Sequence, residues 1–358
     1  MESDNSDAKG IIFNLKKAVF FIIVGVMIFE VFTYFLASGL GFQIYFFTPS
    51  GLAESKMYVT NLPIYIFLLF NAILPFPVNV GDLFLTLWLL YLTCLAFASL
   101  GPKMNFVDSV KNPSKGLFSN YLFAFTLLAN AALFLTLAIQ TFQESQGIPT
   151  GNPFGSQTDN YLLLLLLTYA PVVEEIGFRI VPIGLTFLTF FYMTRKSTGN
   201  EDSGWKSKVI LFSFLYPEGV KRELNLKTFH RDGLSAITRT EWAAILVTAM
   251  VFGFVHYLSG WGIGKVTSAF AVGVILAVSF IIYGVYAPIL IHWFLNFYWQ
   301  SFSFGAELYP ALSPFVDGIS YLSLAIGGAF CAYILAQIIE KLVKRVISSN
   351  KSHLETVG

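Results

Sequence analysis

The chain has 358 residues, of which 56% are hydrophobic and only 12% are charged, with a formal net charge of +1. Soluble domains contain about 25% charged residues, so this surface is too apolar for an ordinary water-soluble fold. The two cysteines, Cys94 and Cys331, lie inside apolar runs, which excludes a disulfide framework and a zinc–thiolate cluster. The composition predicts an all-α, polytopic membrane helix bundle.

Eight apolar runs are long enough to cross the hydrocarbon core of a bilayer, which is about 30 Å thick. The first run is longer than the core of a signal peptide, which has about 7–15 residues, so we expect it to be a retained helix. The runs predict about eight transmembrane helices. In chain order they occupy residues 18–40, 82–100, 119–142, 160–193, 242–258, 264–284, 285–303 and 319–341.

The segment 61–80 is apolar but contains three prolines and three asparagines. Non-helical backbone is stable at membrane depth only where protein or water covers it. We therefore expect 61–80 to be a re-entrant or broken segment. If it crosses the membrane instead, the bundle has nine crossings and the acidic N-terminus lies outside.

Basic side chains are distributed unevenly between the connections. Lysine and arginine gather in 101–118, in 194–241 and in the C-terminal tail, whereas 143–159 and 304–318 contain none. Short basic connections stay in the cytoplasm. The pattern therefore predicts that both termini are cytoplasmic.

The long segment 194–241 is an insert between predicted helices. Its apolar core, KVILFSFLY, lies beside basic residues and could rest on the membrane surface; we favour a solvated loop attracted to anionic lipid.

The predicted organisation has a cytoplasmic N-terminal segment 1–17, N-terminal membrane helices 18–150, a membrane core 160–303 with the cytoplasmic insert 194–241, a last membrane helix 319–341 and a cytoplasmic tail 342–358.

The stretch PVVEEIGFRI places Glu174, Glu175 and Arg179 inside an apolar run. Each ionised side chain at mid-membrane costs about 2.5–3.5 kcal/mol, and such residues usually mark function. Glu175 and Arg179 are four residues apart with the acid first, the favourable order for an ion pair on a helix. That pair leaves Glu174 as the surplus acid. A buried ion pair that only fixes helix packing is the alternative, which the unpaired acid disfavours.

Two further motifs place polar side chains on later membrane helices. FGFVH contains Phe252 and His256, and HWFLN contains His292 and Asn296. In each motif the two residues are four apart and share one helix face. A single intramembrane histidine usually has a packing role, but two histidines and a spare glutamate on three helices can converge on one site.

This set of side chains favours hydrolysis without a covalent intermediate. No GxSxG motif provides an activated serine. A glutamate beside a histidine can activate water as a general base, and a histidine with an asparagine amide can stabilise an oxyanion. Two histidines and a carboxylate can also bind catalytic zinc. Because HExxH is absent and Asn296 suits an oxyanion role better, we expect no metal and no cofactor.

The three motifs together resemble the CAAX-protease and bacteriocin-processing family, which includes the Ras-converting prenyl-protein endopeptidases. EEIGFR matches EExxxR, FGFVH matches FxxxH, and HWFLN matches HxxxN, over about residues 160–303. The resemblance implies an intramembrane endopeptidase that cuts near the C-terminus of prenylated or other membrane-associated proteins.

By the same resemblance, each motif residue has an implied role. Glu174 is the base that activates water with His256, and His292 and Asn296 form the oxyanion pair. The remaining motif residues, Glu175, Arg179 and Phe252, support the site.

Two other classes of function are compatible with the sequence. Intramembrane acids and histidines also relay protons or cations in transporters, although no inverted repeat of the kind common in transporters is evident. A non-catalytic membrane scaffold or immunity protein would retain the fold without the reaction. For the protease we expect a lipidated or membrane-associated peptide or protein as substrate, and no nucleic acid as partner. We expect a multi-pass protein of the cell membrane, or of the endoplasmic reticulum membrane in a eukaryote. Its active site should open to the cytoplasm.

Overall fold

The computed structural model describes residues 2–101, 105–111, 120–154, 159–198 and 204–357. Parts of the predicted connections 101–118 and 143–159 and of the insert 194–241 lie outside the described residues. Within the described residues, seven helices are long and apolar enough to cross a membrane. These spans are Phe20–Phe47, Val80–Leu100, Tyr121–Ser145, Asn160–Met193, Arg239–Leu258, Lys265–Tyr283 and Pro310–Lys344.

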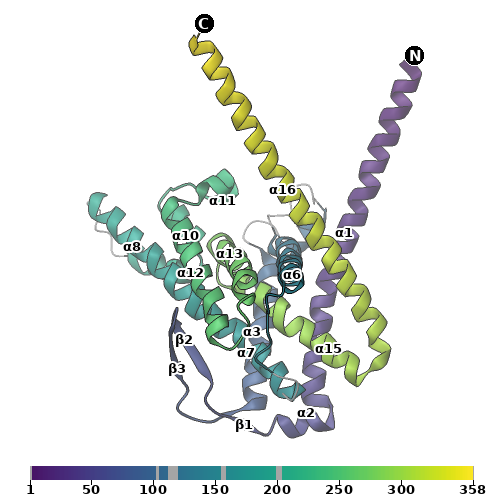
Figure 1. Ribbon diagram of the computed structural model, residues 1–358, viewed down its shortest axis with the longest axis vertical. Coiled ribbons are helices and arrows are strands. Elements are labelled where there is room, and N and C mark those ends of the chain that lie inside the picture. The colour runs from purple at the N-terminus through teal and green to yellow at the C-terminus, as the bar shows by residue number, and fades with distance from the viewer. Residues whose placement is uncertain (1, 102–104, 112–119, 155–158, 199–203, 358) are drawn as a thin grey trace.

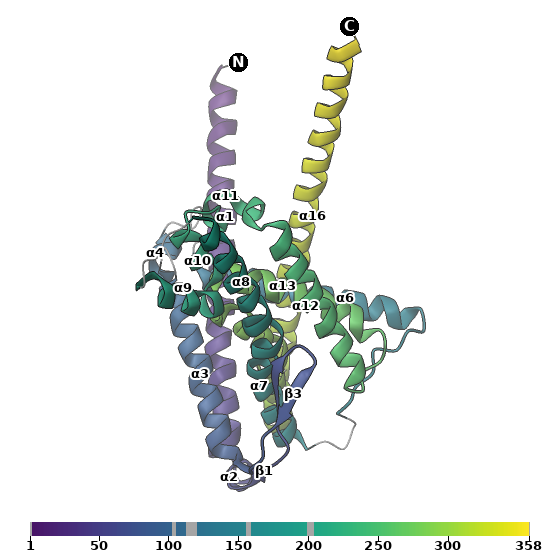
Figure 2. The same cartoon turned by 90° about the vertical axis from the view of Figure 1, so that its left-hand side faces the viewer.

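The structure confirms the predicted all-α, polytopic bundle, and the protein is an integral, multi-pass membrane protein (Figures 1 and 2). The predicted span 285–303 is not among the seven, and it forms three consecutive helical segments. In chain order the helices are α1 (Glu2–Phe47), α2 (Pro49–Glu54), α3 (Val80–Leu100), α4 (Phe106–Lys111), α6 (Tyr121–Ser145), α7 (Asn160–Glu175), η1 (Ile176–Ile180), α8 (Val181–Thr198), α9 (Gly204–Leu215), α10 (Pro217–Glu223), α11 (Phe229–Asp232), η2 (Gly233–Ala236), α12 (Arg239–Leu258), α13 (Lys265–Tyr283), α14 (Tyr286–Trp293), η3 (Phe294–Tyr298), α15 (Trp299–Leu308), η4 (Pro310–Leu312) and α16 (Ser313–Val357).

Polar residues determine where the membrane helices begin. The side chains of Asn79, Asn120 and Asp159 accept hydrogen bonds from first-turn amides of α3, α6 and α7. Thr238 and Glu241 form a reciprocal capping box at the start of α12. Such caps satisfy amides that have no partner inside the helix.

Buried tyrosines fix the helices that carry the motifs. The hydroxyl of Tyr91 on α3 donates to the carbonyl of Thr168 on α7. Tyr121 on α6 donates to the carbonyl of Ala287 on α14 over 2.6 Å. A buried tyrosine contributes a large apolar ring but needs a partner for its hydroxyl. These bonds therefore set the position of α7 and α14 relative to the rest of the bundle.

The segment 61–80 forms strands, in agreement with the expectation that it is not a continuous membrane helix. β2 (Pro63–Phe67) and β3 (Phe70–Ile73) pair as an antiparallel hairpin, and β1 (Tyr58–Val59) pairs with β4 (Val78–Asn79) at its base. The hairpin lies beside α7 and η1 (Figures 1 and 2). The sequence did not predict strands, because the prolines and asparagines indicated only a break.

The insert is not a solvated loop, and that interpretation was wrong. Its described part folds into α9, α10, α11 and η2, which pack on the bundle. Val209, Val220 and Ile237 are buried against apolar residues of α8, α12 and α13. The Lys221 ammonium donates to Glu241 Oε2 over 2.8 Å and ties the insert to α12. Of the segment KVILFSFLY, Val209 belongs to this second core and Phe212 packs against it, whereas Ile210, Leu211 and Leu215 are exposed.

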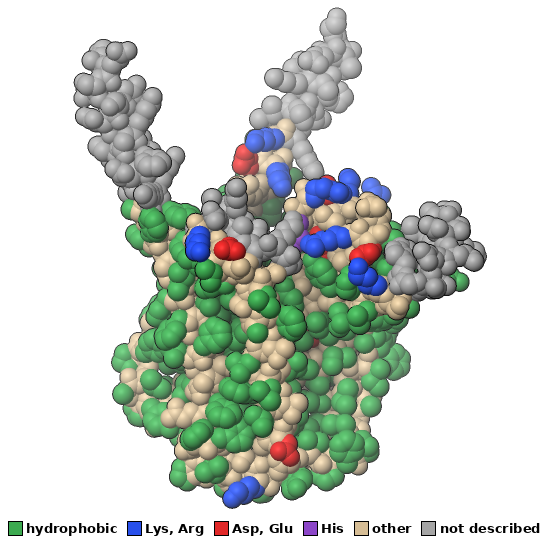
Figure 3. Space-filling view, turned by 180° about the vertical axis from the view of Figure 1, so that it is seen from behind, with side chains coloured by type: hydrophobic (Ala, Val, Ile, Leu, Met, Phe, Trp, Pro, Cys, Tyr) green, Lys and Arg blue, Asp and Glu red, His purple; other side chains and the backbone are tan. Residues whose placement is uncertain are grey.

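Basic side chains gather at the end of the molecule where both termini lie, and the surface away from that end is mostly hydrophobic (Figures 1 and 3). The described parts of the segments predicted to share one side of the membrane therefore lie at one end of the bundle.

Candidate active site

Four helical segments bring the motif residues to one cavity of about 860 Å³. α7 supplies Glu174, α12 supplies His256, α14 supplies His292 and η3 supplies Asn296. All four side chains line the cavity, together with Phe252. The structure therefore joins residues that are up to 122 positions apart in the sequence.

Glu175 and Arg179 form the ion pair that their spacing predicts. Arg179 Nη1 donates to Glu175 Oε1 over 3.0 Å, and both side chains are fully buried. The same oxygen lies 2.8 Å from His292 Nδ1. Because a carboxylate only accepts, His292 donates from Nδ1, and its Nε2 faces Glu174. Glu175 thus orients the histidine as well as pairing with the arginine, a contact that the sequence did not predict.

Glu174 is the acid without a strong partner. Its Oε2 lies 3.7 Å from His292 Nε2, and no hydrogen bond to this buried oxygen occurs among the described residues. The side chain is 20% exposed, whereas that of Glu175 is 0% exposed. A buried, unsatisfied carboxylate oxygen is costly. Glu174 lines the cavity, where water or a substrate can bind to this oxygen.

His256 has a defined tautomer. Its Nδ1 lies 2.8 Å from the carbonyl oxygen of Phe252, one turn earlier in α12. A carbonyl only accepts, so the proton is on Nδ1, and Nε2 of the neutral ring is a free base. In the described part of the chain no direct hydrogen bond joins His256 to Glu174. A bound molecule is therefore needed to connect the two groups.

The Phe252 ring packs among the charged groups. The Arg179 guanidinium carbon lies 4.0 Å from its centroid, which is the geometry of a cation–π contact. The ring also makes edge contacts with His256 at 4.7 Å and with His292 at 5.9 Å between centroids. This side chain, which the FxxxH motif singled out, thus contacts the arginine and both imidazoles.

Two short π-helices adjoin the motif residues. η1 begins directly after Glu175, and η3 contains Asn296. Such turns occur often at functional sites. The amide of Leu68 in the hairpin donates to the carbonyl of Gly177 in η1 over 2.9 Å. The first π-helix thus holds the hairpin that forms one wall of the cavity.

Several residues that the sequence analysis missed also line the cavity. Tyr65 comes from β2, Trp261 from the connection after α12, and Lys265 from the first position of α13. The sequence feature that could have identified Lys265 is a single charged residue at the start of an apolar helix. Tyr65 gave no usable signal, because 61–80 was not recognised as a hairpin.

The walls of the cavity include residues 151–154. This stretch belongs to a connection without basic residues, which the charge pattern assigns to the side opposite the cytoplasm. An opening of the site towards the cytoplasm therefore stays a prediction.

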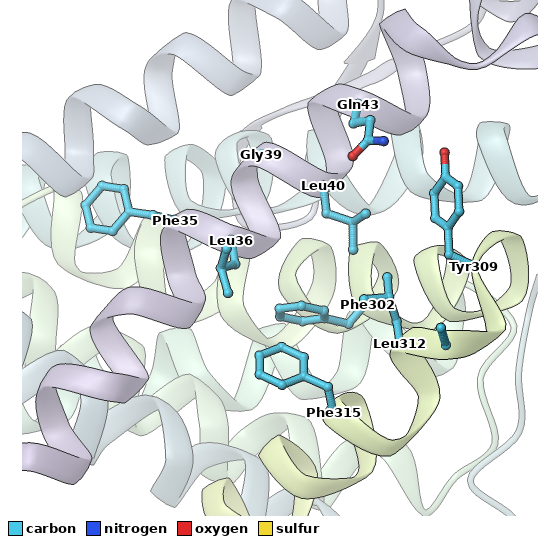
Figure 4. A pocket seen from close by; sticks show the side chains of 10 residues that line it. Phe35, Leu36, Gly39, Leu40, Gln43, Phe302, Tyr309, Leu312 and Phe315 are labelled. Carbon is cyan, nitrogen blue, oxygen red and sulfur yellow. The ribbon is translucent and has the colours of Figure 1, made fainter.

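A second cavity of about 620 Å³ lies between α1 and the helices α15 to α16 (Figure 4). Its lining contains no carboxylate and no imidazole, so it lacks the groups that hydrolysis needs. In the described ranges, no group of three or more His, Cys, Asp or Glu side chains is arranged to hold a metal ion.

Comparison with known proteins identifies one family. Residues 156–298 match the family model of type II CAAX prenyl endopeptidases, Rce1-like, over less than half of the chain. No curated protein and no solved structure matches the chain. The match contains all three motifs and confirms the predicted resemblance. The part of the chain that carries the candidate site is similar to the Rce1-like CAAX prenyl endopeptidases.

Proposed function

We propose that the protein is an intramembrane endopeptidase that hydrolyses a peptide bond near the C-terminus of prenylated or other membrane-associated proteins. The observation that carries the proposal is the convergence of Glu174, His256, His292 and Asn296 on one cavity, within the segment that matches the endopeptidase family. The end of the molecule that is rich in lysine and arginine would face the cytoplasm.

In the proposed reaction, Glu174 and His256 hold a water molecule between them. The unpartnered Oε2 of Glu174 and the free Nε2 of His256 are the acceptors for its two protons. Glu174 takes one proton as the water oxygen attacks the carbonyl carbon of the peptide bond. No metal and no covalent enzyme intermediate are required for this step.

His292 and Asn296 would stabilise the negative oxygen of the tetrahedral intermediate. Nδ1 of His292 is already committed to Glu175, so the donor would be Nε2 of the protonated ring, alongside the Asn296 amide. When the C–N bond breaks, the proton held by Glu174 passes to the leaving nitrogen. The products are a new C-terminal carboxylate and a free peptide amine.

The test is Glu174→Gln on purified protein with a quenched prenyl-peptide substrate. The amide keeps the shape but cannot take the proton, so we expect cleavage to fall by about 10²–10⁴-fold with unfolding unchanged. Glu340→Gln is the matched control, because Glu340 is exposed on α16 and pairs with the exposed Lys344. Unchanged cleavage by Glu174→Gln would exclude Glu174 as the base.

Metal analysis of the same preparation separates the two hydrolytic mechanisms. We expect full activity without stoichiometric zinc and after chelation. Zinc that is bound at one ion per chain, and is lost together with activity, would instead support a metal-dependent mechanism.

A further inference from the structure

Lys265 places a positive charge in the wall of the cavity that contains the candidate catalytic groups. Its ammonium lies 4.3 Å from the centroid of the Trp261 ring, which lines the same cavity. The centroid of the Trp261 ring in turn lies 6.1 Å from the centroid of the His256 ring. Lys265 is therefore held on an aromatic surface adjacent to one of the histidines.

The ammonium group of Lys265 forms no salt bridge with a carboxylate in the described part of the chain. The two buried cations in the described part of the chain, Arg179 and Lys221, each pair with a glutamate within 3.0 Å. Lys265 forms no ion pair with a described residue, Glu174 included. A cation inside a membrane protein is costly unless it pairs, and a neutral indole ring compensates only part of that cost. A ligand that enters the cavity can supply an anion for this ammonium group.

We propose that Lys265, positioned by Trp261, binds the free C-terminal carboxylate of the peptide substrate and so selects peptide bonds close to a chain end. This inference rests on the proposed function. A compact cavity of this volume is about 12 Å across, the length of about three to four extended residues. A carboxylate on Lys265 and a peptide bond at Glu174 can thus belong to the same short C-terminal segment.

The test uses two prenyl-peptides that differ only at the end, one with a free carboxylate and one with a carboxamide. We expect the wild type to cleave the acid with kcat/KM at least tenfold higher, mainly through KM. Lys265→Met, which keeps the length of the side chain but not its charge, should lose this preference. Lys265→Arg should restore most of it. Lys208→Met, which removes an exposed cation of α9, is the matched control and should keep the preference.

Two results would overturn the inference while leaving the proposed function intact. In one, the wild type cleaves both peptides equally well. In the other, Lys265→Met slows cleavage of the acid and the amide by the same factor, which would mean that Lys265 acts on Glu174 or on an anionic lipid.

A binding measurement separates this inference from the proposed function. Fluorescence anisotropy of labelled acid and amide peptides on Glu174→Gln requires no catalysis. Tighter binding of the acid that disappears when Lys265→Met is added would support carboxylate recognition even if the wild type cleaves neither peptide. Equal binding of the two peptides would contradict it.

Discussion

Glu175 connects the buried charges of the site through a single oxygen atom. Oε1 accepts from Arg179 and from His292, which come from different helices. Its spacing from Arg179 was enough to predict the ion pair, because residues four apart meet on any helix. The contact with His292 was not predictable, since it joins residues 117 positions apart and depends on how the helices pack.

Replacing Glu175 by glutamine should destabilise the protein strongly. The change leaves the Arg179 guanidinium buried without a counter-charge, and breaking a buried pair in this way costs about 3–5 kcal/mol. We expect a clear fall in the melting temperature in detergent, partly reversed when Arg179→Met is added. Glu340→Gln, on an exposed helix face, should leave the melting temperature unchanged. An equally stable Glu175→Gln variant would show that the pair does not hold the helix in place.

At the scale of elements, the contact between the hairpin and η1 determines one wall of the site. A Cβ atom at Gly177 would lie 2.4 Å from the Cβ of Tyr65, so the strand approaches the helix closely only because residue 177 is glycine. Gly177→Ala should displace the hairpin and destabilise the protein by about 1–3 kcal/mol. The same change should lower peptide cleavage.

Gly318→Ala is the matched control for that substitution. Gly318 lies in α16, and a Cβ added there meets nothing within 4 Å. The control should be neutral or slightly stabilising, because alanine favours a helix more than glycine does. If both variants behave alike, close packing at Gly177 is not what positions the hairpin.

Most of the helices were predictable, because apolar length alone identifies a membrane span. The features that shape the site were not. A π-helix leaves no periodic signal in five residues, and the strands of 61–80 depend on pairing partners and on a glycine in another element. The insert was misjudged because its apolar residues face a core that only tertiary packing creates.

At the scale of the whole molecule, the docked insert makes stability depend on pH. Burial raises the pKa of Glu218 in α10 above its ordinary value of 4.5, although nearby Lys221 and the backbone amides of Phe229 and His230 oppose the shift. The folded state then binds this proton more tightly than the unfolded state. Protonated Glu218 therefore contributes to the free energy of unfolding at low pH, and this contribution is lost as the pH rises above about 4.5 towards the raised pKa.

Glu218→Gln should remove this loss. We expect the melting temperature of the variant, relative to that of the wild type, to increase as the pH is raised from about 5 to 8. The measurement is thermal unfolding in detergent. Glu340→Gln changes an exposed carboxylate and should give a curve parallel to the wild type. A difference between Glu218→Gln and the wild type that shrinks with rising pH would contradict the assignment.

Each of the two π-helices holds one residue more than a regular α-helical path would use. Deleting one residue from η1 or η3 would let the turn close into a regular α-helix, and the residues within the turn would shift by about 100° around the axis. Arg179 would then rotate away from Glu175, or Asn296 away from the cavity that it lines. The number of residues in these two turns therefore determines whether the motif side chains meet, and a relative with a gap or an insertion there would lack the arrangement on which the proposed activity depends.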